Sequence, residues 1–279
     1  MDFGINLYLW TTEITKDHLH LFGKMKRAGF DGVEIPVGSA NWNGYEEMRK
    51  VLDNEGLGCT TITNVGPDKN TVGEDPAARR AALDEIKFGI EASHTLGSDI
   101  LVGPYQAAYG HFSGAGPSDE ELDRSADILR EAAEFADSAG IRLGLEFLNR
   151  FEGYLLNTLE QSASLAKKVA HPALGVLYDT HHAHIEESDP GKSIRDHAES
   201  IFHVHFSENN RGPLGSGQVR WSETVEALKD VGYDAWVTAE AFAADVPNLS
   251  SVAHVWRNTF TSKEEFADGA IAFLHEVWR

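Results

Sequence analysis

Amphipathic helical stretches that end at glycine, each followed almost at once by a short β-rich run, recur along the chain. Five copies are clear, at residues 28–35, 55–63, 96–102, 139–146 and 231–240. Glycine accepts the left-handed conformation that closes a helix. The apolar runs that follow have the length and composition of parallel strands buried on both faces. The pattern therefore predicts a series of helix-then-strand units.

Three further apolar runs, at residues 3–9, 174–179 and 201–206, bring the predicted strands to eight. Predicted helices lie between them, at about residues 17–28, 45–54, 77–96, 119–139, 159–169, 191–199, 222–231 and 263–278. Several of these helices have start signals of the cap or capping-box type, at Asp75-Pro76, at Ser118 with Glu121, and at Ser262 with Glu265.

The connections differ in length at the two ends of the predicted strands. Helix-to-strand links are a few residues long, whereas the links after the third, fourth, seventh and eighth strands are long. This asymmetry predicts an α/β fold, a single-domain (β/α)8 TIM barrel over residues 1–279, with its functional face at the carboxyl ends of the strands. An open doubly wound sheet is the alternative, but residues 10–13 after the first strand contain no Gly-rich phosphate loop.

Composition narrows the partners of such a barrel. The chain has 279 residues, 42% of them hydrophobic, and a formal charge of −20 from 24 basic and 44 acidic residues. That charge argues against a nucleic-acid or membrane partner and favours a small neutral substrate. Cys59 is the single cysteine, the N-terminus lacks the regions of a signal peptide, and no apolar run is long enough to span a bilayer. We therefore expect a cytoplasmic protein.

Ionisable residues stand at the ends of four successive predicted strands: Glu146, Asp179, His205 and Glu240. One such residue alone is usually a structural ion-pair partner. Four on neighbouring strands of a barrel converge, and three carboxylates in one cavity repel one another unless a cation is present. One imidazole with three carboxylates is an oxygen-rich ligand set that suits Mn²⁺ first, with Mg²⁺ or Co²⁺ as alternatives.

Four motifs at these positions resemble those of a known family. They are residues 145–152 (LEFLNRFE), residues 179–182 (DTHH) followed by 185–187 (IEE), residues 203–211 (HVHFSENNR), and residues 240–242 (EAF). Together they resemble the ketose 3-epimerases of the D-tagatose/D-psicose 3-epimerase type, in the xylose isomerase-like TIM-barrel superfamily of sugar phosphate isomerases and epimerases. The resemblance covers nearly the whole chain.

The resemblance implies roles for seven residues of this chain. The metal ligands would be Glu146, Asp179, His205 and Glu240, of which Glu146 and Glu240 would also be the catalytic acid/base pair. Glu152, His182 and Arg211 would bind the substrate oxygens around C1 to C3. His181 departs from the phenylalanine that is usual in the family, which leaves the identity of the sugar open.

Other residues have two interpretations. The aromatic residues in the loops after the first and fourth strands would either stack on a sugar or form a lid, or would pack against the barrel or another subunit. These residues are Trp10, Tyr105, Tyr109 and Phe112. His203 is expected on the opposite side of its strand from His205, as a packing residue or a support for a ligand. His181 and His184 are expected in the loop after the sixth strand, where they would either face solvent or contact the substrate. The family resemblance implies a homo-oligomer, a dimer or tetramer, with Trp256 and Phe260 as candidate contacts.

The sequence thus predicts a metal-dependent epimerase that inverts C3 of a free ketose through an enediolate, with Glu146 and Glu240 on opposite faces of the substrate. A phosphorylated sugar is disfavoured because the loops at the site offer few cations beyond Arg211 and Arg220. The alternatives are a metal-dependent lyase or hydratase that acts on 3-keto sugars or glycosides by β-elimination, and an aldose–ketose isomerase. Two other classes share the barrel: an abasic-site endonuclease, which the negative charge disfavours, and a noncatalytic sugar-binding protein.

Overall fold

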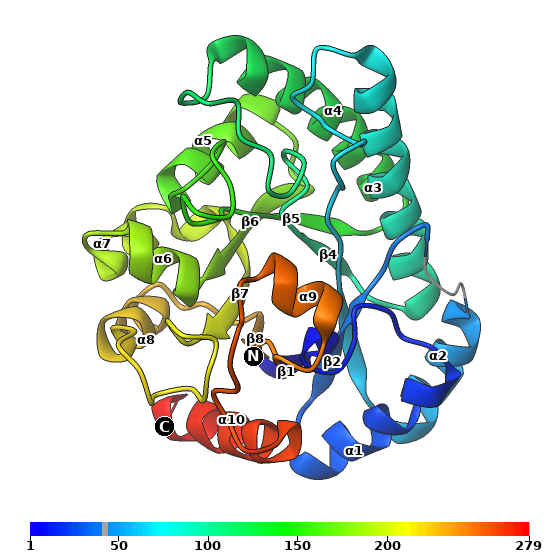
Figure 1. The fold of residues 1–279 in the computed structure, drawn as a ribbon, viewed down its shortest axis with the longest axis vertical. Coiled ribbons are helices and arrows are strands. Elements are labelled where there is room, and N and C mark those ends of the chain that lie inside the picture. Colours follow the sequence, from blue (N-terminus) through cyan, green and yellow to red (C-terminus); the bar gives the residue numbers. More distant parts are fainter. Residues whose placement is uncertain (41–43, 279) are drawn as a thin grey trace.

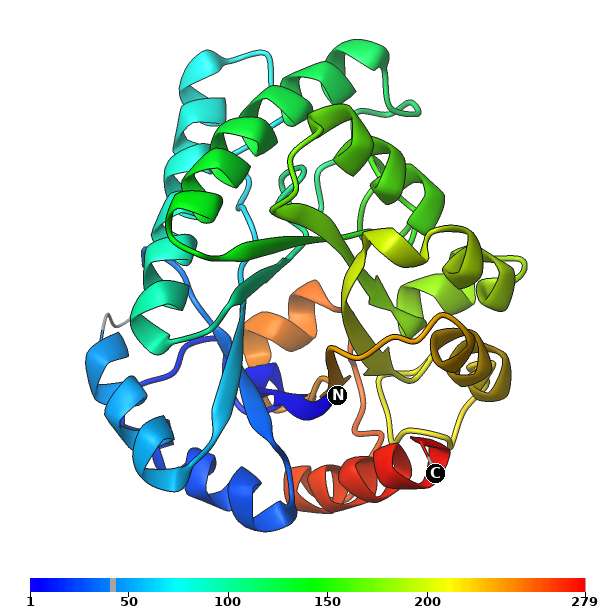
Figure 2. The same ribbon diagram turned by 180° about the vertical axis from the view of Figure 1, so that it is seen from behind.

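The computed structural model of the chain describes residues 1–40 and 44–278. Eight parallel strands form a closed barrel in the order of the sequence, and helices surround it (Figures 1 and 2). The strands are β1 (Asp2–Asn6), β2 (Gly32–Pro36), β3 (Gly58–Ile62), β4 (Ile100–Gly103), β5 (Arg142–Glu146), β6 (Leu174–Asp179), β7 (Ile201–Ser207) and β8 (Trp236–Glu240). The predicted TIM barrel is confirmed.

The predicted helices follow the strands. They are α1 (His20–Ala28), α2 (Tyr45–Glu55), α3 (Pro76–Leu96), α4 (Asp119–Ser138), α5 (Leu159–Val169), α7 (Pro190–Asp196), α8 (Trp221–Asp230) and α10 (Lys263–Trp278). Two short helices, α6 (Thr180–Glu186) and α9 (Pro247–Val252), lie in the connections that leave the carboxyl ends of β6 and β8. In Figure 1, α9 lies over the opening of the barrel.

The local signals for helix ends operate as expected. Gly29 and Gly97 close α1 and α3 with φ of 108° and 77°, a conformation that disfavours a side chain, and β2 and β4 begin three residues later. At the start of α4, Ser118 accepts a hydrogen bond from the Glu121 backbone N–H, and the Glu121 carboxylate accepts one from the Ser118 N–H. Asp75 caps α3 through the N–H of Ala77.

Two predicted boundaries are wrong for a local reason. The first strand was expected to reach residue 9, but it ends at Asn6 because the Asn6 side chain accepts a hydrogen bond from the Tyr8 N–H and starts a 3₁₀ turn at Leu7–Leu9. The segment directly after β6, expected as a loop, is the helix α6. Its N-cap is Asp179, whose Oδ1 accepts from the N–H groups of His181 and His182.

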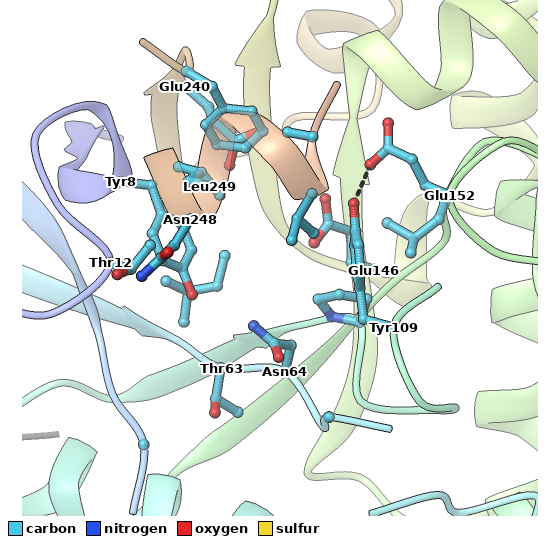
Figure 3. Close-up of a pocket in the computed structure, with 18 of the residues that line it drawn as sticks. Tyr8, Thr12, Thr63, Asn64, Tyr109, Glu146, Glu152, Glu240, Asn248 and Leu249 are labelled. Carbon is cyan, nitrogen blue, oxygen red and sulfur yellow. Dashed lines mark hydrogen bonds between the residues drawn. The ribbon is translucent and has the colours of Figure 1, made fainter. Parts of the chain in front are cut away.

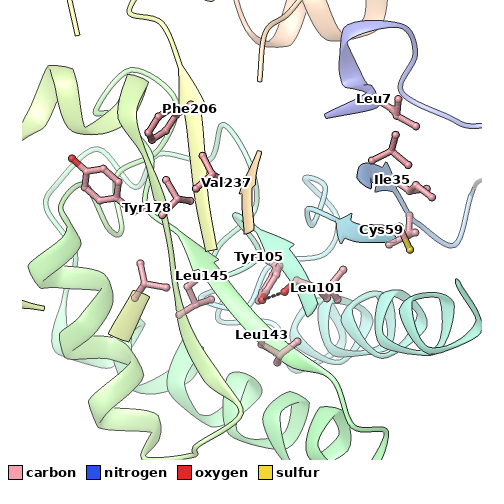
Figure 4. Close-up of a cluster of buried hydrophobic side chains, with 14 of the residues drawn as sticks. Leu7, Ile35, Cys59, Leu101, Tyr105, Leu143, Leu145, Tyr178, Phe206 and Val237 are labelled. Carbon is pink, nitrogen blue, oxygen red and sulfur yellow. Dashed lines mark hydrogen bonds between the residues drawn. The ribbon is translucent and has the colours of Figure 1, made fainter. Parts of the chain in front are cut away.

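The alternation of side chains along each strand separates two apolar layers. Outward-pointing residues such as Leu143, Leu145 and Phe206 pack against the helices (Figure 4). A smaller group of inward-pointing residues closes the barrel interior, with Ile62, Ile100, Val102 and Leu177 fully or almost fully buried. Because successive side chains point to opposite faces, the residues that end β5 to β8 lie inside the barrel, and the outer layer holds their strands rigidly.

Candidate metal centre and substrate cavity

Three of the predicted metal ligands lie together inside the barrel. They are Asp179, His205 and Glu240, at most 2% exposed, and each offers a donor atom within 4.8 Å of the other two. The Nδ1 atom of His205 lies 3.7 Å from Asp179 Oδ2 and 3.5 Å from Glu240 Oε1. Residues from β6, β7 and β8 thus converge at the carboxyl end of the barrel.

Glu146 joins this centre from the β5 side. It forms a second potential ligand group with Asp179 and His182, and its Oε1 lies 3.4 Å from Nε2 of His182. Asp179 is the member that the two groups share. All four predicted ligands are therefore adjacent, although among the described residues no single group within 4.8 Å contains all of them.

The donor atoms fit a divalent cation. Asp179 Oδ2 and His205 Nδ1 are buried and have no hydrogen-bond partner among the described residues, which is costly for polar atoms unless another group satisfies them. The set of carboxylate oxygens with one imidazole nitrogen suits Mn²⁺ or Mg²⁺.

The charges of the centre shift the ionisation of its members. Burial raises the pKa of Glu240 to about 8, helped by Asp179 and Glu146 and opposed by His205 and Arg211. Despite burial, the charges of His182, His205 and Arg211 hold the pKa of Asp179 well below its usual range. Burial lowers the pKa of His205, but the charges of Glu34 and Glu240 outweigh it and raise that pKa well above its usual value.

Arg211 places a second positive charge in the centre. Its Nη1 donates hydrogen bonds to Glu240 Oε2 at 2.6 Å and to Ser207 Oγ at 2.8 Å, and it lies 3.7 Å from Asp179 Oδ2. The guanidinium also lies over the Phe242 ring, 4.5 Å from its centroid. The backbone of Arg211 has φ of 56°, a left-handed conformation that turns the side chain of this loop residue into the barrel.

The other two predicted substrate residues are held by Asn149. The backbone N–H of Asn149 donates to His182 Nδ1 at 3.0 Å, and its side-chain amide donates to Glu152 Oε1 at 2.8 Å. Because Nδ1 of His182 accepts, its Nε2 carries the proton and faces Glu146. The phenol of Tyr109 donates to Glu152 Oε2 at 2.7 Å. Asn149 and Tyr109 thus orient two side chains toward the same space.

A cavity of about 480 Å³ opens in front of these residues (Figure 3). Glu146, Glu152, His182, Arg211 and Glu240 all line it. Its other walls come from the β1–α1, β3–α3 and β8–α10 connections and include Tyr8, Asn64, Phe242, Asn248 and Leu249. The predicted catalytic and substrate residues therefore face one cavity, and its volume lies in the range of small-molecule sites.

The aromatic loop residues divide between the two interpretations. Tyr109 lines the cavity, whereas Tyr105 is buried in the core and donates to the Leu101 carbonyl. Phe112 is 48% exposed and Trp10 packs on the core; neither lines the cavity. Stacking on a sugar is thus open to Tyr109 alone among these four.

The prediction for His203 is wrong, and one of the two alternatives for His181 is excluded. His203 lies on the same face of β7 as His205, not the opposite one, because residues two apart on a strand point the same way; Nε2 atoms of both contact Glu34, at 3.0 and 2.7 Å. The predicted role of His203 as a support is consistent with that contact. His181 is not solvent-facing: it is 8% exposed, its Nδ1 lies 3.2 Å from the Glu208 carbonyl, and burial lowers its pKa to about 4.

Two residues next to the centre were missed in the sequence. Glu34, on β2, is fully buried beside His205, and Asn6, at the end of β1, donates to both Glu34 Oε1 and Glu240 Oε1 at 2.9 and 3.0 Å. A glutamate inside the apolar run Gly-Val-Glu-Ile-Pro is a signal that could have pointed to Glu34. Asn6 carries no comparable signal, since asparagine at a strand end is also a common turn residue.

The chain is similar to several known proteins over nearly its whole length. The sequence profile of the xylose isomerase-like TIM barrel family matches residues 22–269. The ketose 3-epimerase of Arthrobacter globiformis is 30% identical over 279 residues, which cover 99% of this chain and 96% of the relative. The 3-dehydro-D-guloside 4-epimerase of Escherichia coli K12 is 30% identical over 230 residues, covering 80% of this chain and 86% of the relative.

A solved structure of an L-ribulose 3-epimerase superimposes with a TM-score of 0.94 at 29% identity, and the match covers 99% of this chain and 94% of that one. Within the described residues, no helix is long and apolar enough to cross a membrane. Relatives that are ketose 3-epimerases place the chain among the isomerases. Since the family profile spans most of the sequence, the chain belongs to the xylose isomerase-like TIM barrel family.

Proposed function

We propose that the protein is a metal-dependent epimerase that inverts C3 of a free ketose. One observation carries this proposal: Glu146 and Glu240, on β5 and β8, line the same cavity, with Asp179 and His205 on the two strands between them. Inversion beside a ketone requires one base to remove a proton and one acid to return it from the opposite face. Two carboxylates on separate strands that face one cavity meet that requirement.

In the proposed reaction, one glutamate takes the proton from C3, and the electrons of that C–H bond form the C2–C3 double bond of an enediolate. The other glutamate then donates a proton to the opposite face of C3 as the ketone re-forms. A divalent cation held by Glu146, Asp179, His205 and Glu240 would stabilise the negative charge that develops on the substrate oxygens. Glu152, His182 and Arg211 would hold the hydroxyl groups near the reacting carbon.

The cavity favours an unphosphorylated sugar. Among the described residues that line it, Arg211 is the one arginine or lysine, and it is already paired with Glu240. Lys69, which does not line the cavity, pairs with the carboxylate of Glu85, which does. Neither cation is free to bind a phosphate group, which favours a neutral substrate.

Three finer assignments belong to the same proposal. We propose Mn²⁺ as the bound metal, because three carboxylates and one imidazole form a mainly hard ligand set, with Mg²⁺ or Co²⁺ as alternatives. We propose a cytoplasmic location, consistent with a single, buried and unpaired Cys59. We also propose a homo-oligomer, a dimer or tetramer; Trp256, 72% exposed after α9, remains a candidate contact.

The test is incubation of the Mn²⁺-loaded protein with D-fructose, D-tagatose or ribulose in D₂O. The proposal predicts the C3 epimer of at least one ketose, with deuterium at C3. Glu240→Gln should abolish both exchange and conversion but leave sugar binding detectable, whereas Glu131→Gln, on the outside of α4, should leave both unchanged. Epimerisation by Glu240→Gln at the wild-type rate would exclude the proposed acid/base pair.

A second candidate acts on a keto-glycoside at the same site. It is favoured by the 30% identity to the 3-dehydro-D-guloside 4-epimerase, which is comparable to that of the ketose 3-epimerase relative. Proton removal beside a carbonyl is common to epimerisation, β-elimination and aldose–ketose isomerisation. Inertness toward every free ketose, combined with epimerisation or cleavage of a 3-keto glycoside, would support this candidate against ours.

A further inference from the structure

Glu34 is a fully buried carboxylate of β2 that lies inside the barrel and does not line the cavity. Its Oε1 lies 2.7 Å from His205 Nε2 and accepts a hydrogen bond from Asn6 Nδ2 at 2.9 Å. Its Oε2 lies 3.0 Å from His203 Nε2 and accepts a hydrogen bond from Thr60 Oγ1 at 2.9 Å. Two hydrogen-bond donors and two close imidazole nitrogens around one carboxylate offset the cost of removing it from water.

The partners of Oε1 lead directly to candidate metal ligands. His205 has one ring nitrogen at Glu34 and the other, Nδ1, between Asp179 and Glu240, at 3.7 and 3.5 Å. Asn6 uses the same Nδ2 atom to donate to Glu34 and, at 3.0 Å, to Glu240 Oε1. Glu34 thus contacts the candidate metal ligand His205 directly and is linked to the candidate ligand Glu240 through the Asn6 amide. Of its Oε2 partners, the His203 ring packs edge-on against the His205 ring, with centroids 5.2 Å apart, whereas among the described contacts Thr60 touches neither candidate ligand.

We propose that Glu34 is a positioning residue for the metal centre: it keeps the proton of His205 on Nε2, so that the Nδ1 lone pair faces the cation, and with Asn6 it fixes Glu240. This inference rests on the proposed metal dependence. The physical reason is that a neutral imidazole carries its proton on the nitrogen that faces an acceptor, and a carboxylate is the strongest acceptor available there. The contact is close in distance, although its direction lies outside regular hydrogen-bond geometry.

Mn²⁺ affinity, measured by isothermal titration calorimetry on the full chain without sugar, tests the inference. Glu34→Gln keeps the shape of the side chain but removes its charge, and loss of such a support typically weakens metal binding by about 10–100-fold. The matched control is Thr60→Val, which removes one donor from Oε2 and should change the Mn²⁺ Kd by less than about threefold, since Thr60 does not contact a ligand. A Glu34→Gln Kd within threefold of the wild-type value, or an equal loss in Thr60→Val, would overturn the proposal.

A second measurement uses the wild-type protein and therefore tests the inference even if Glu34→Gln fails to fold. In Mg²⁺-loaded wild-type protein labelled with ¹⁵N-histidine, the His205 spectrum should show a protonated Nε2 and an unprotonated Nδ1. A His205 that carries its proton on Nδ1 would contradict the assignment. Because neither readout uses a sugar, a protein that binds metal as expected but epimerises no ketose would refute the proposed function and leave the role of Glu34 intact.

Discussion

Substitution of Arg211 should show how far this guanidinium neutralises the negative charge of Asp179 and Glu240 when no metal is bound. Arg211 is 4% exposed, and its guanidinium donates a hydrogen bond to Glu240 at 2.6 Å. Truncating one partner of a buried ion pair costs about 3–5 kcal/mol, because the remaining charge is left uncompensated. For Arg211→Ala we expect about 3 kcal/mol, the lower end of that range, since Glu240, whose pKa is raised to about 8, can take up a proton.

For a chain of 279 residues that loss corresponds to a fall in Tm of about 5 °C. The assay is thermal unfolding followed by circular dichroism, in EDTA and again in saturating Mn²⁺. In EDTA the full decrease should appear. With Mn²⁺ the decrease should be less than half as large, because the cation then compensates Asp179 and Glu240 in place of the guanidinium.

Arg80→Ala is the matched control for this prediction. Arg80 pairs with Glu131 at 3.2 Å on the surface, where both side chains are about half exposed, at 57% and 47%. A pair of this kind contributes about 0–1 kcal/mol, and Mn²⁺ should not alter the effect of removing it. An equal decrease for Arg211→Ala in EDTA and in Mn²⁺ would refute the view that the arginine and the metal neutralise the same carboxylates.

Three further predictions concern separate parts of the molecule. Tyr109→Phe removes the 2.7 Å hydrogen bond to Glu152. Loss of about 1.5 kcal/mol should raise KM for the ketose about tenfold and change kcat less. Steady-state kinetics that show only a fall in kcat would contradict this role. Mn²⁺ binding should release at least one proton at pH 7 and weaken as pH falls, because His205 has a raised pKa and must lose a proton to become a ligand. Calorimetry in buffers of different ionisation enthalpy measures the number of protons released. Release of no proton would count against the prediction. Gly103→Ala should lower the free energy of unfolding by about 2 kcal/mol or more. Gly103 has φ of 131°, and a Cβ there would lie 2.0 Å from the Thr63 carbonyl oxygen. An unchanged midpoint of urea unfolding would contradict this prediction.

The barrel, and the convergence of the four predicted metal ligands inside it, were predictable from the sequence because both depend on local information. Glycine-ended helices and apolar runs specify each helix-then-strand unit by residues close together in the chain. In a closed barrel of parallel strands, chain order is also spatial order, so residues that end successive strands must be neighbours. Glu146, Asp179, His205 and Glu240 follow from that rule. The side of His203 follows from strand alternation too, and the prediction for it failed because that rule was misapplied.

What only the tertiary structure decided is which residues meet across the barrel and which loop residues turn inward. Asn6, Glu34 and Glu240 come from β1, β2 and β8, and they meet because closure brings the first and last strands together. Arg211 reaches Glu240 through a left-handed backbone that its own sequence neighbourhood does not require. These contacts depend on strand register and loop packing, which arise from many weak interactions between residues far apart in the chain. Local sequence patterns carry the periodicity of each element but not the distances between elements.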